Sequence, residues 1–338
     1  MSLTKQIAKA QEVFSACQSP VYFFDDDPDG LAAYLLLHQK KPGKGIPLKG
    51  KPLDAEMAQH ANDADLVVVL DKHSVKDEFF SSIAAPCLWL DHHKIQHPPQ
   101  SCTYVNPRRE DKNIPTSGLA YLVVEDGEWI AVSGVVSDWE LPFPLLRERC
   151  EQKYPGFLAK DITEAPVALY TSDAGKVARL FSLLLKGRSK HIKKAVKLIE
   201  QIKSPEELLK VTSEAGQELR SMLAPKEEEY DTLLSSVPAP ENNVLVFTYS
   251  ENTTSYTTDL SNELLAKYPE AVILIARESR GSYKCSLRGS QVRIDLILDQ
   301  ILATVNGSGG GHEHACGAVI PSDEFAHFVE LLRAKVQE

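Results

Sequence analysis

Short apolar runs of strand length alternate with longer helical patterns in the first half of the chain. The runs are VYFF (21–24), DLVVVLD (65–71) and PCLWLDHH (86–93), and the helical patterns are LAAYLLLHQK (31–40) and TSGLAYLVVE (116–125). A continuous apolar run is typical of a strand buried on both faces, as in parallel sheets covered by helices. We therefore predict an α/β fold whose N-terminal domain is a doubly wound, mostly parallel sheet.

The second half has a helical part followed by a smaller α/β pattern. The proline-rich string VPAPENN (237–243) is the best linker, and the strand-like runs NVLVFTY, AVILIAR and YKCSLRG alternate with helical patterns after it. We divide the chain into an N-terminal domain at 1–185, a helical connector at 186–240 and a smaller C-terminal α/β domain at 241–338.

Acidic residues stand at the ends of several apolar runs. The first run ends in DDDPDG (25–30), the next two end in Asp71 and Asp91, and the apolar segment WIAVSGVVSD (129–138) ends in Asp138. We expect these carboxylates to share one sheet edge, because ligands of such sheets bind outside the carboxyl ends of the strands. Carboxylates with imidazole and without thiolates suit manganese, magnesium or iron better than structural zinc. An Asp-rich loop by itself is also compatible with a solvated turn.

A glycine run, NGSGGGHEHACG, follows the last helical pattern of the C-terminal domain. It lacks the GK[ST] ending of a nucleotide-binding P-loop. Backbone NH groups without side chains can approach phosphate oxygens, and His312 next to them can add a donor. The run therefore indicates either a phosphate cradle or a flexible connector.

Composition restricts the partners. The chain has a formal net charge of −10, whereas proteins that hold long duplexes usually carry a basic surface. A nucleic-acid ligand should therefore be short or meet a local basic patch. No apolar run approaches the length of a membrane span, and the six cysteines are scattered without disulfide spacing. We expect a cytoplasmic protein that binds no membrane.

The motifs, taken in order, resemble the DHH phosphoesterase superfamily in its DHH–DHHA1 subfamily, which includes RecJ-like exonucleases and nanoRNase-like phosphodiesterases. The N-terminal motifs are DDDPDG (25–30), Asp71 after LVVVL, DHH (91–93) and GVVSD (134–138), and the C-terminal ones are SLRG (286–289) and GGGHEHACG (309–317). The resemblance covers nearly the whole chain. It implies a DHH domain followed by a DHHA1 domain.

The resemblance also implies two divalent cations, with Mn²⁺ preferred and Mg²⁺ or Co²⁺ as alternatives. The implied ligands are Asp27, Asp29, Asp71, His92 and Asp138, with Asp71 bridging the two cations. The implied catalytic residues are His93, which would face the scissile phosphate, Asp71 and Asp29. The implied substrate-binding residues are Arg288, Gly310, Gly311, His312 and Asn106.

Two positions depart from the pattern of the superfamily. Many members have a histidine ligand where this chain has Phe23, which cannot bind a cation; either Asp25 serves as the ligand instead or the first cation site is weak. The motif around Asp71 is usually D-x-G, whereas here it continues with Lys72 and His73. His73 could supply the missing nitrogen, Lys72 or His73 could contact phosphate, or His73 could be only a polar residue at a strand end.

The resemblance implies a metal-dependent phosphodiesterase or exonuclease that hydrolyses short single-stranded RNA, DNA or linear dinucleotides to mononucleotides through a hydroxide bridging the two cations. The alternatives are a phosphatase for pAp or polyphosphate and a non-catalytic scaffold for nucleic-acid factors. Both a monomer and a homodimer remain compatible with the sequence.

Overall fold

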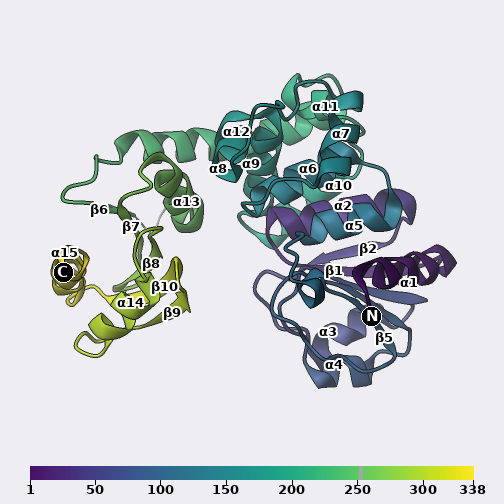
Figure 1. Ribbon diagram of the computed structural model, residues 1–338, viewed down its shortest axis with the longest axis horizontal. Coiled ribbons are helices and arrows are strands. Elements are labelled where there is room, and N and C mark those ends of the chain that lie inside the picture. Colours follow the sequence, from purple (N-terminus) through teal and green to yellow (C-terminus); the bar gives the residue numbers. More distant parts are fainter. Residues whose placement is uncertain (251–253) are drawn as a thin grey trace. The chain divides into compact units, whose positions relative to one another are not determined.

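The computed structural model describes residues 1–250 and 254–338 (Figure 1). The chain forms two compact units, Met1–Leu223 and Ala224–Glu338. The division falls within helix α12 (Glu214–Ser236) and therefore inside the predicted helical connector. Each unit has its own five-stranded sheet.

The N-terminal unit contains a parallel sheet in the strand order β2-β1-β3-β4-β5. Its strands are β1 (Pro20–Phe24), β2 (Lys44–Pro47), β3 (Leu66–Leu70), β4 (Cys87–Leu90) and β5 (Cys102–Val105). The apolar runs form β1, β3 and β4, which are buried along their whole length. The lysine-rich stretch that follows α2 (Pro28–Lys40) adds the edge strand β2.

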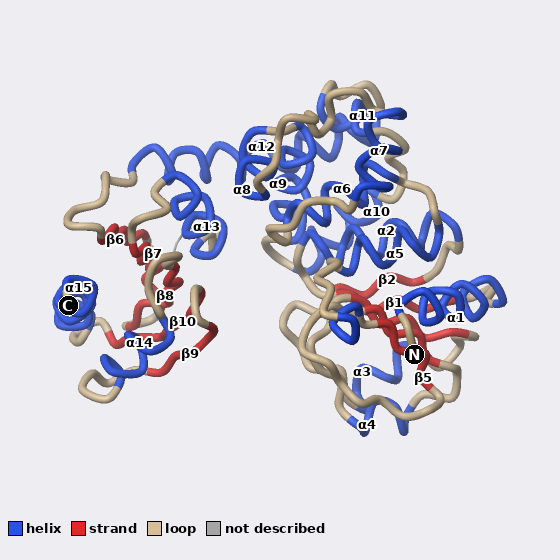
Figure 2. Tube along the Cα trace, in the orientation of Figure 1, coloured by secondary structure: helices blue, strands red, loops and turns tan. Residues whose placement is uncertain are grey.

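Helices cover both faces of this sheet, so the predicted doubly wound α/β fold is confirmed (Figure 2). One face carries α1 (Leu3–Ala16), α2 and α5 (Thr116–Val124), and the other carries α3 (Ala55–Ala58), η1 (Gln59–Ala61) and α4 (Asp77–Ser82). Successive strand residues face opposite layers. The ring of Phe24 stacks on Tyr34 of α2 with centroids 4.6 Å apart, whereas Phe23 meets Phe79 of α4 at 5.5 Å.

The rest of the N-terminal unit is helical. It comprises η2 (Pro107–Glu110), α6 (Glu128–Ser137), α7 (Pro144–Lys153), α8 (Ala165–Thr171), α9 (Asp173–Leu185), α10 (Ser189–Ile199), α11 (Pro205–Leu209) and the first part of α12. The apolar segment 129–138 was expected to end at the sheet edge, but it is helix α6. It is apolar on all sides because it packs among α2, α5 and α9, and a helix buried all round has the same pattern as a buried strand.

The C-terminal unit is the smaller α/β unit that the sequence predicts. Its strands are β6 (Val244–Tyr249), β7 (Val272–Ser279), β8 (Ser282–Arg288), β9 (Ser308–His312) and β10 (Ala315–Pro321), in the order β6-β7-β8-β10-β9. Only the β6–β7 pair of this sheet is parallel. The helices are α13 (Thr257–Lys267), α14 (Ile294–Leu302) and α15 (Phe325–Gln337). The core lies between one face of the sheet and helices α14 and α15.

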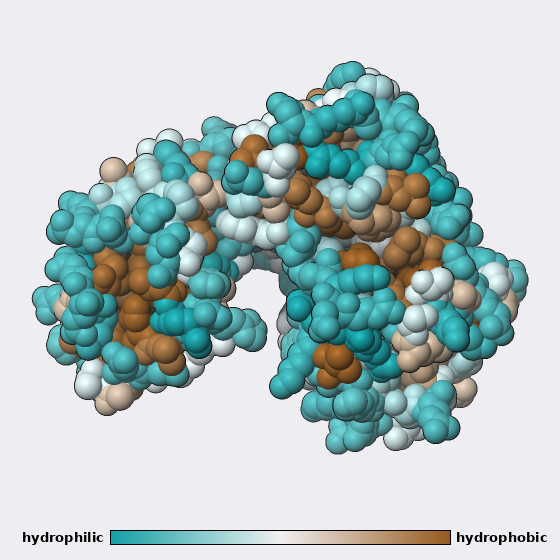
Figure 3. Space-filling view, in the orientation of Figure 1, coloured by the Kyte–Doolittle hydropathy of each residue, from teal (hydrophilic) through white to brown (hydrophobic). Residues whose placement is uncertain are grey.

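The surface is mostly hydrophilic on the face drawn in Figure 3, with smaller hydrophobic areas on both units. All six cysteines are buried and free. None of the helices in the described part of the chain combines the length and the hydrophobicity that a membrane span needs.

Candidate active site

Acidic residues follow three neighbouring strands of the parallel sheet. Asp25 follows β1, Asp71 follows β3 and Asp91 follows β4. The backbone NH of Asp71 donates to the carbonyl of Leu90 at 3.0 Å, so the hydrogen bonding between β3 and β4 continues as far as Asp71. The next strands in sequence, β2 and β3, lie on opposite sides of β1, and such a switch point is where open α/β sheets bind ligands.

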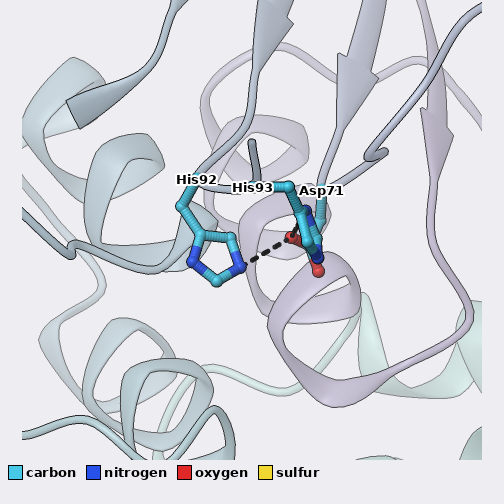
Figure 4. A group of neighbouring side chains, drawn as sticks. All are labelled: Asp71, His92 and His93. Atoms are coloured by element: carbon cyan, nitrogen blue, oxygen red, sulfur yellow. Dashed lines mark ion pairs between the residues drawn. The ribbon is translucent and has the colours of Figure 1, made fainter. Parts of the chain in front are cut away.

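Two histidines bring their rings to the carboxylate of Asp71 (Figure 4). One potential ligand atom from each of Asp71, His92 and His93 lies within 4.8 Å of the other two. His92 Nε2 is 3.4 Å from Asp71 Oδ1 and 3.5 Å from Oδ2 of Asp138, which the C-terminal end of α6 places there. Three predicted cation ligands, Asp71, His92 and Asp138, are therefore neighbours.

Asp29 joins this group from the first turn of α2. Its Oδ2 accepts a hydrogen bond from the backbone NH of Thr116 at 2.7 Å, and its Oδ1 accepts from the backbone NH of Ser117 at 3.0 Å and from the Ser117 hydroxyl. The Thr116 hydroxyl donates to Asp71 Oδ1 at 3.0 Å. The first NH groups of a helix lack partners within the helix, so Asp29 serves as a cap for α5.

Asp27 is the N-cap residue of α2. Its Oδ1 accepts from the backbone NH of Gly30 at 2.8 Å. A Cβ atom on Gly30 would lie 2.7 Å from the carbonyl oxygen of Asp25. Only glycine therefore allows α2 to begin this close to the end of β1, and the helix start carries Asp27 and Asp29 into the same region.

The first predicted cation position is surrounded by Phe23, Asp25 and His73. Phe23, which replaces the expected histidine, is fully buried in the core. Asp25 Oδ1 lies 3.0 Å from the ammonium of Lys72. His73 is exposed, and its ring centroid is 6.1 Å from that of His93.

A buried network orients His93. Its Nδ1 donates to Asp91 Oδ1 at 2.8 Å, and Asp91 Oδ2 accepts from Tyr104 and from Asn106 Nδ2, each at 3.2 Å. Asn106 Nδ2 also donates to the carbonyl of His93 at 3.0 Å. Asn106 was predicted to contact substrate, but its side chain lies fully buried behind the histidines. The geometry therefore favours a positioning role for Asn106.

The carboxylates are short of positive charge. Burial raises the pKa of Asp27 and Asp29 well above the ordinary value, and repulsion from Asp71 raises both further. Burial also raises the pKa of Asp138 to about 6. Burial alone would raise the pKa of Asp71 as well, but its contacts with His92 hold that pKa below the ordinary value.

His92 supplies part of the missing charge. Burial alone would lower its pKa, but hydrogen bonding to Asp71 and the charges of Asp138 and Asp29 outweigh burial and raise the pKa to about 10. Its Nδ1 is buried and has no hydrogen-bonding partner among the described residues. The contacts of Nε2 therefore orient the ring.

These residues fit a divalent cation. Several desolvated carboxylates with raised pKa values surround one imidazole nitrogen, and a cation would relieve their mutual repulsion. Oxygen and imidazole ligands without thiolates suit Mn²⁺ or Mg²⁺. The residues that would hold it are Asp29, Asp71, His92 and Asp138.

The C-terminal unit brings most of its predicted substrate residues to one face of its sheet. Arg288 of β8, Ala315 of β10 and His312 of β9 pair in one row, and Gly317 and Gly310 pair two residues further along. Paired residues project to the same face of a sheet. Arg288 and His312 therefore flank a surface built from alanine and glycine, and β9 is exposed along its length.

The two predicted glycines, Gly310 and Gly311, lie on opposite faces of the sheet, because neighbouring strand residues face opposite sides. A Cβ on Gly310 would meet no atom within 4 Å. A Cβ on Gly311 would lie 2.7 Å from Cys316 Cα and still closer to the carbonyl oxygen of Ala315. Gly311 is thus required for strand packing, whereas Gly310 leaves its face open. The glycine run is an edge strand, not a loop.

Sequence reasoning did not identify the supporting residues. Asp91 was expected at the sheet edge but not as the partner that orients His93, and the roles of Tyr104, Thr116 and Ser117 were not predicted. One signal was available for Thr116 and Ser117, because they begin a predicted helix and therefore offer free NH groups. The pairing of Asp25 with Lys72 spans 47 positions and has no local signal.

Comparison with known protein families identifies the domain family of the C-terminal unit. Residues 241–338 match the DHHA1 domain family. A search of curated protein sequences finds no match. The structure is similar to that of RecJ in complex with Mn²⁺ from Thermus thermophilus, with a TM-score of 0.67 and 16% identity over 99% of this chain and 54% of RecJ.

Two further solved structures have the same fold over nearly their whole lengths. Exonuclease RecJ bound to manganese has a TM-score of 0.64 and 16% identity, over 100% of this chain and 95% of that protein. A pGpG-specific phosphodiesterase from Vibrio cholerae has a TM-score of 0.54 and 14% identity, over 95% of this chain and 99% of that protein. The chain spans about half of the Thermus protein. The C-terminal unit therefore carries a DHHA1 domain, and the chain as a whole has the two-unit fold of these RecJ structures.

Proposed function

We propose that the chain is a divalent-cation-dependent phosphodiesterase that hydrolyses short single-stranded oligonucleotides or linear dinucleotides to mononucleotides. The observation that carries this proposal is the cluster of Asp29, Asp71, His92, His93 and Asp138 at the carboxyl ends of the parallel strands. Proteins of the same fold include an exonuclease and a pGpG-specific phosphodiesterase, which supports the proposal. The acidic net charge of −10 favours short substrates over long duplexes.

The proposed cofactor is Mn²⁺, with Mg²⁺ or Co²⁺ as alternatives. Structures of RecJ contain Mn²⁺ or Mg²⁺. When bound, such ions neutralise phosphate charge and lower the pKa of water. The carboxylates of Asp71 and Asp138 approach His92 Nε2 to 3.4 and 3.5 Å, and the charge of Asp29 interacts with all three of these residues. A second ion would need Asp25 and Asp27, and Asp25 already faces a lysine.

His93 is the proposed proton donor. Its side chain is 41% exposed, so it is accessible to a substrate. Burial alone would lower its pKa, but hydrogen bonding to Asp91 and the charge of Asp71 raise it, which favours the protonated ring. Because Nδ1 is bonded to Asp91, Nε2 is the atom that can donate a proton to a phosphate oxygen or to the leaving oxygen. Asn106 would act through Asp91, which it helps to hold.

The face of the C-terminal unit between Arg288 and His312 is the proposed phosphate-binding surface. Arg288 Nε donates to Asn262 Oδ1 of α13 at 2.7 Å, which fixes the guanidinium on the sheet. Guanidinium groups bind phosphate through paired NH donors. Gly310 would allow a phosphate close to the backbone.

A panel of substrates tests the proposal. The purified protein with Mn²⁺ should release mononucleotides from linear dinucleotides and five-residue RNA or DNA, and it should act less on pAp, cyclic dinucleotides and polyphosphate. Asp71→Ala should abolish the activity, whereas the matched variant Asp63→Ala changes an exposed aspartate of the same unit and should leave it unchanged. Preferential turnover of pAp or polyphosphate would identify a phosphatase instead. No turnover of any substrate with Mn²⁺, Mg²⁺ or Co²⁺ would favour a scaffold.

A further inference from the structure

Lys72 places a buried positive charge inside the acidic site. Its side chain is only 6% exposed, and its ammonium lies 3.0 Å from Asp25 Oδ1. Its carbonyl oxygen accepts the indole NH of Trp89 at 3.1 Å, so the backbone at this position is anchored to the core. A lysine buried to this degree cannot act as a surface contact for a phosphate of the substrate.

Asp25 and Asp27 are the carboxylates on which a cation at the first position would depend. Phe23 points into the core and offers no ligand atom. His73 is exposed and does not belong to the group of potential ligand atoms formed by Asp71, His92 and His93. Asp27 caps α2 with Oδ1, which accepts from the backbone NH of Gly30. The carboxylate of Asp25 is itself engaged by Lys72.

The two halves of the site therefore differ in charge. Around His92, the carboxylates Asp29, Asp71 and Asp138 gather without a lysine or arginine paired to any of them in the described part of the chain. Around Asp25, an ammonium is already in place. A divalent cation brought to Asp25 would have to displace a like charge from its partner, which Coulomb repulsion opposes strongly in a buried site.

We propose that Lys72 is a resident cation that replaces one of the two divalent ions, so that each chain binds a single divalent ion through Asp29, Asp71, His92 and Asp138. The inference rests on the proposed function, because it concerns the same site. Its consequence is a site whose second positive charge belongs to the protein itself. Chelators remove only one charge-bearing ion, and the metal dependence of hydrolysis has no cooperativity.

Counting bound Mn²⁺ tests the inference. Equilibrium dialysis of the full-length protein should give one Mn²⁺ per chain, with the electron paramagnetic resonance spectrum of an isolated ion. Lys72→Met should raise the count to two and introduce the spectrum of an exchange-coupled pair, because it leaves the Asp25 carboxylate unpaired. The double variant Asp25→Asn with Lys72→Met should return the count to one. Lys76→Met changes an exposed lysine nearby and should not alter it.

The outcomes separate this inference from the proposed function. Two coupled Mn²⁺ ions in the unmodified protein, together with hydrolysis of dinucleotides, would overturn the role of Lys72 and leave the phosphodiesterase intact. A count of one in Lys72→Met would also overturn it. One bound ion without any hydrolysis would contradict the phosphodiesterase alone, and no bound ion would contradict both. If Lys72→Met does not fold, the count and spectrum of the unmodified protein still decide.

Discussion

Cation binding at His92 should release a proton, and this follows from the charges that surround its ring. In the ion-free protein the pKa of His92 is raised to about 10, so its Nε2 carries a proton at neutral pH. A cation needs that nitrogen unprotonated. At pH 7.5 the gap between pH and pKa corresponds to about 3 kcal/mol, at roughly 1.4 kcal/mol for each pH unit. The observed affinity for Mn²⁺ should therefore rise about tenfold per pH unit between pH 7 and 9.

Asp138 adds a second step at lower pH. Its pKa is raised to about 6 because it is buried, so below that pH a cation must displace a proton from this carboxyl group as well. The slope of log affinity against pH should therefore approach two below pH 6, and it should level off above pH 10. Such a two-step profile identifies His92 and Asp138 as ligands of the same ion.

Isothermal titration calorimetry with Mn²⁺ in buffers of different ionisation enthalpy measures the released protons directly. At least one proton per chain should appear at pH 7.5, because the pKa of His92 is raised to about 10 and the pKa of Asp29, another proposed ligand, is raised as well. His92→Gln should reduce the release above pH 7 and keep the step near pH 6, whereas the exposed His327→Gln should change neither. Tight binding of Mn²⁺ at pH 7.5 without proton release would refute the claim that His92 is protonated in the ion-free protein and loses its proton when the cation binds.

Three further predictions concern stability and binding. A group with a raised pKa stabilises the fold below its unfolded pKa and loses that contribution as pH rises through the folded value. For His92 and Asp138, both losses of stability fall between about pH 4 and pH 10. The melting temperature of the chelator-treated protein should therefore fall from pH 5 to pH 10 and recover with Mn²⁺. Asn106→Ala should cost about 1–3 kcal/mol in urea unfolding, because it removes a buried donor from Asp91, and it should lower kcat more than it raises KM; an unchanged kcat would contradict its positioning role. Gly310→Ala should keep the stability of the protein and weaken the binding of a fluorescent dinucleotide, whereas Gly311→Ala should destabilise the fold by about 1–3 kcal/mol through steric overlap; equal effects on stability would contradict the assignment of opposite faces.

The N-terminal sheet was predictable because its strands are buried on both faces and read as unbroken apolar runs. The position of Asp71 and of DHH (91–93) at one edge followed from that pattern. Asp138 was assigned to the right place for a partly wrong reason, since a buried helix and not an apolar run along the sheet edge delivers it. The positions of these carboxylates could be predicted because they lie where strands and helices end, and the sequence marks these ends clearly.

Contacts between side chains distant in sequence were not predictable. No local pattern shows that Lys72 turns toward Asp25, or that Asn106 is buried behind His93 instead of facing a substrate. The difference between Gly310 and Gly311 depends on the register of an edge strand, and a glycine run carries no periodic pattern that reveals such a register. These features arise from packing, where burial and pairing decide which way each side chain points.

The double role of Asp29 has a consequence for reading related sequences. Its carboxylate closes the first turn of α5 through two backbone NH groups. A descendant of this chain that lost catalysis would still need an acceptor at this position to keep that helix in register with the sheet. The persistence of this aspartate would therefore reflect the requirements of the fold. His92, whose Nε2 contacts the carboxylates of the site and whose Nδ1 bonds to no described residue, would be under less structural constraint than Asp29 once the chemistry is gone. Among relatives, loss of that histidine with retention of that aspartate would mark the proteins that kept the scaffold and abandoned the reaction.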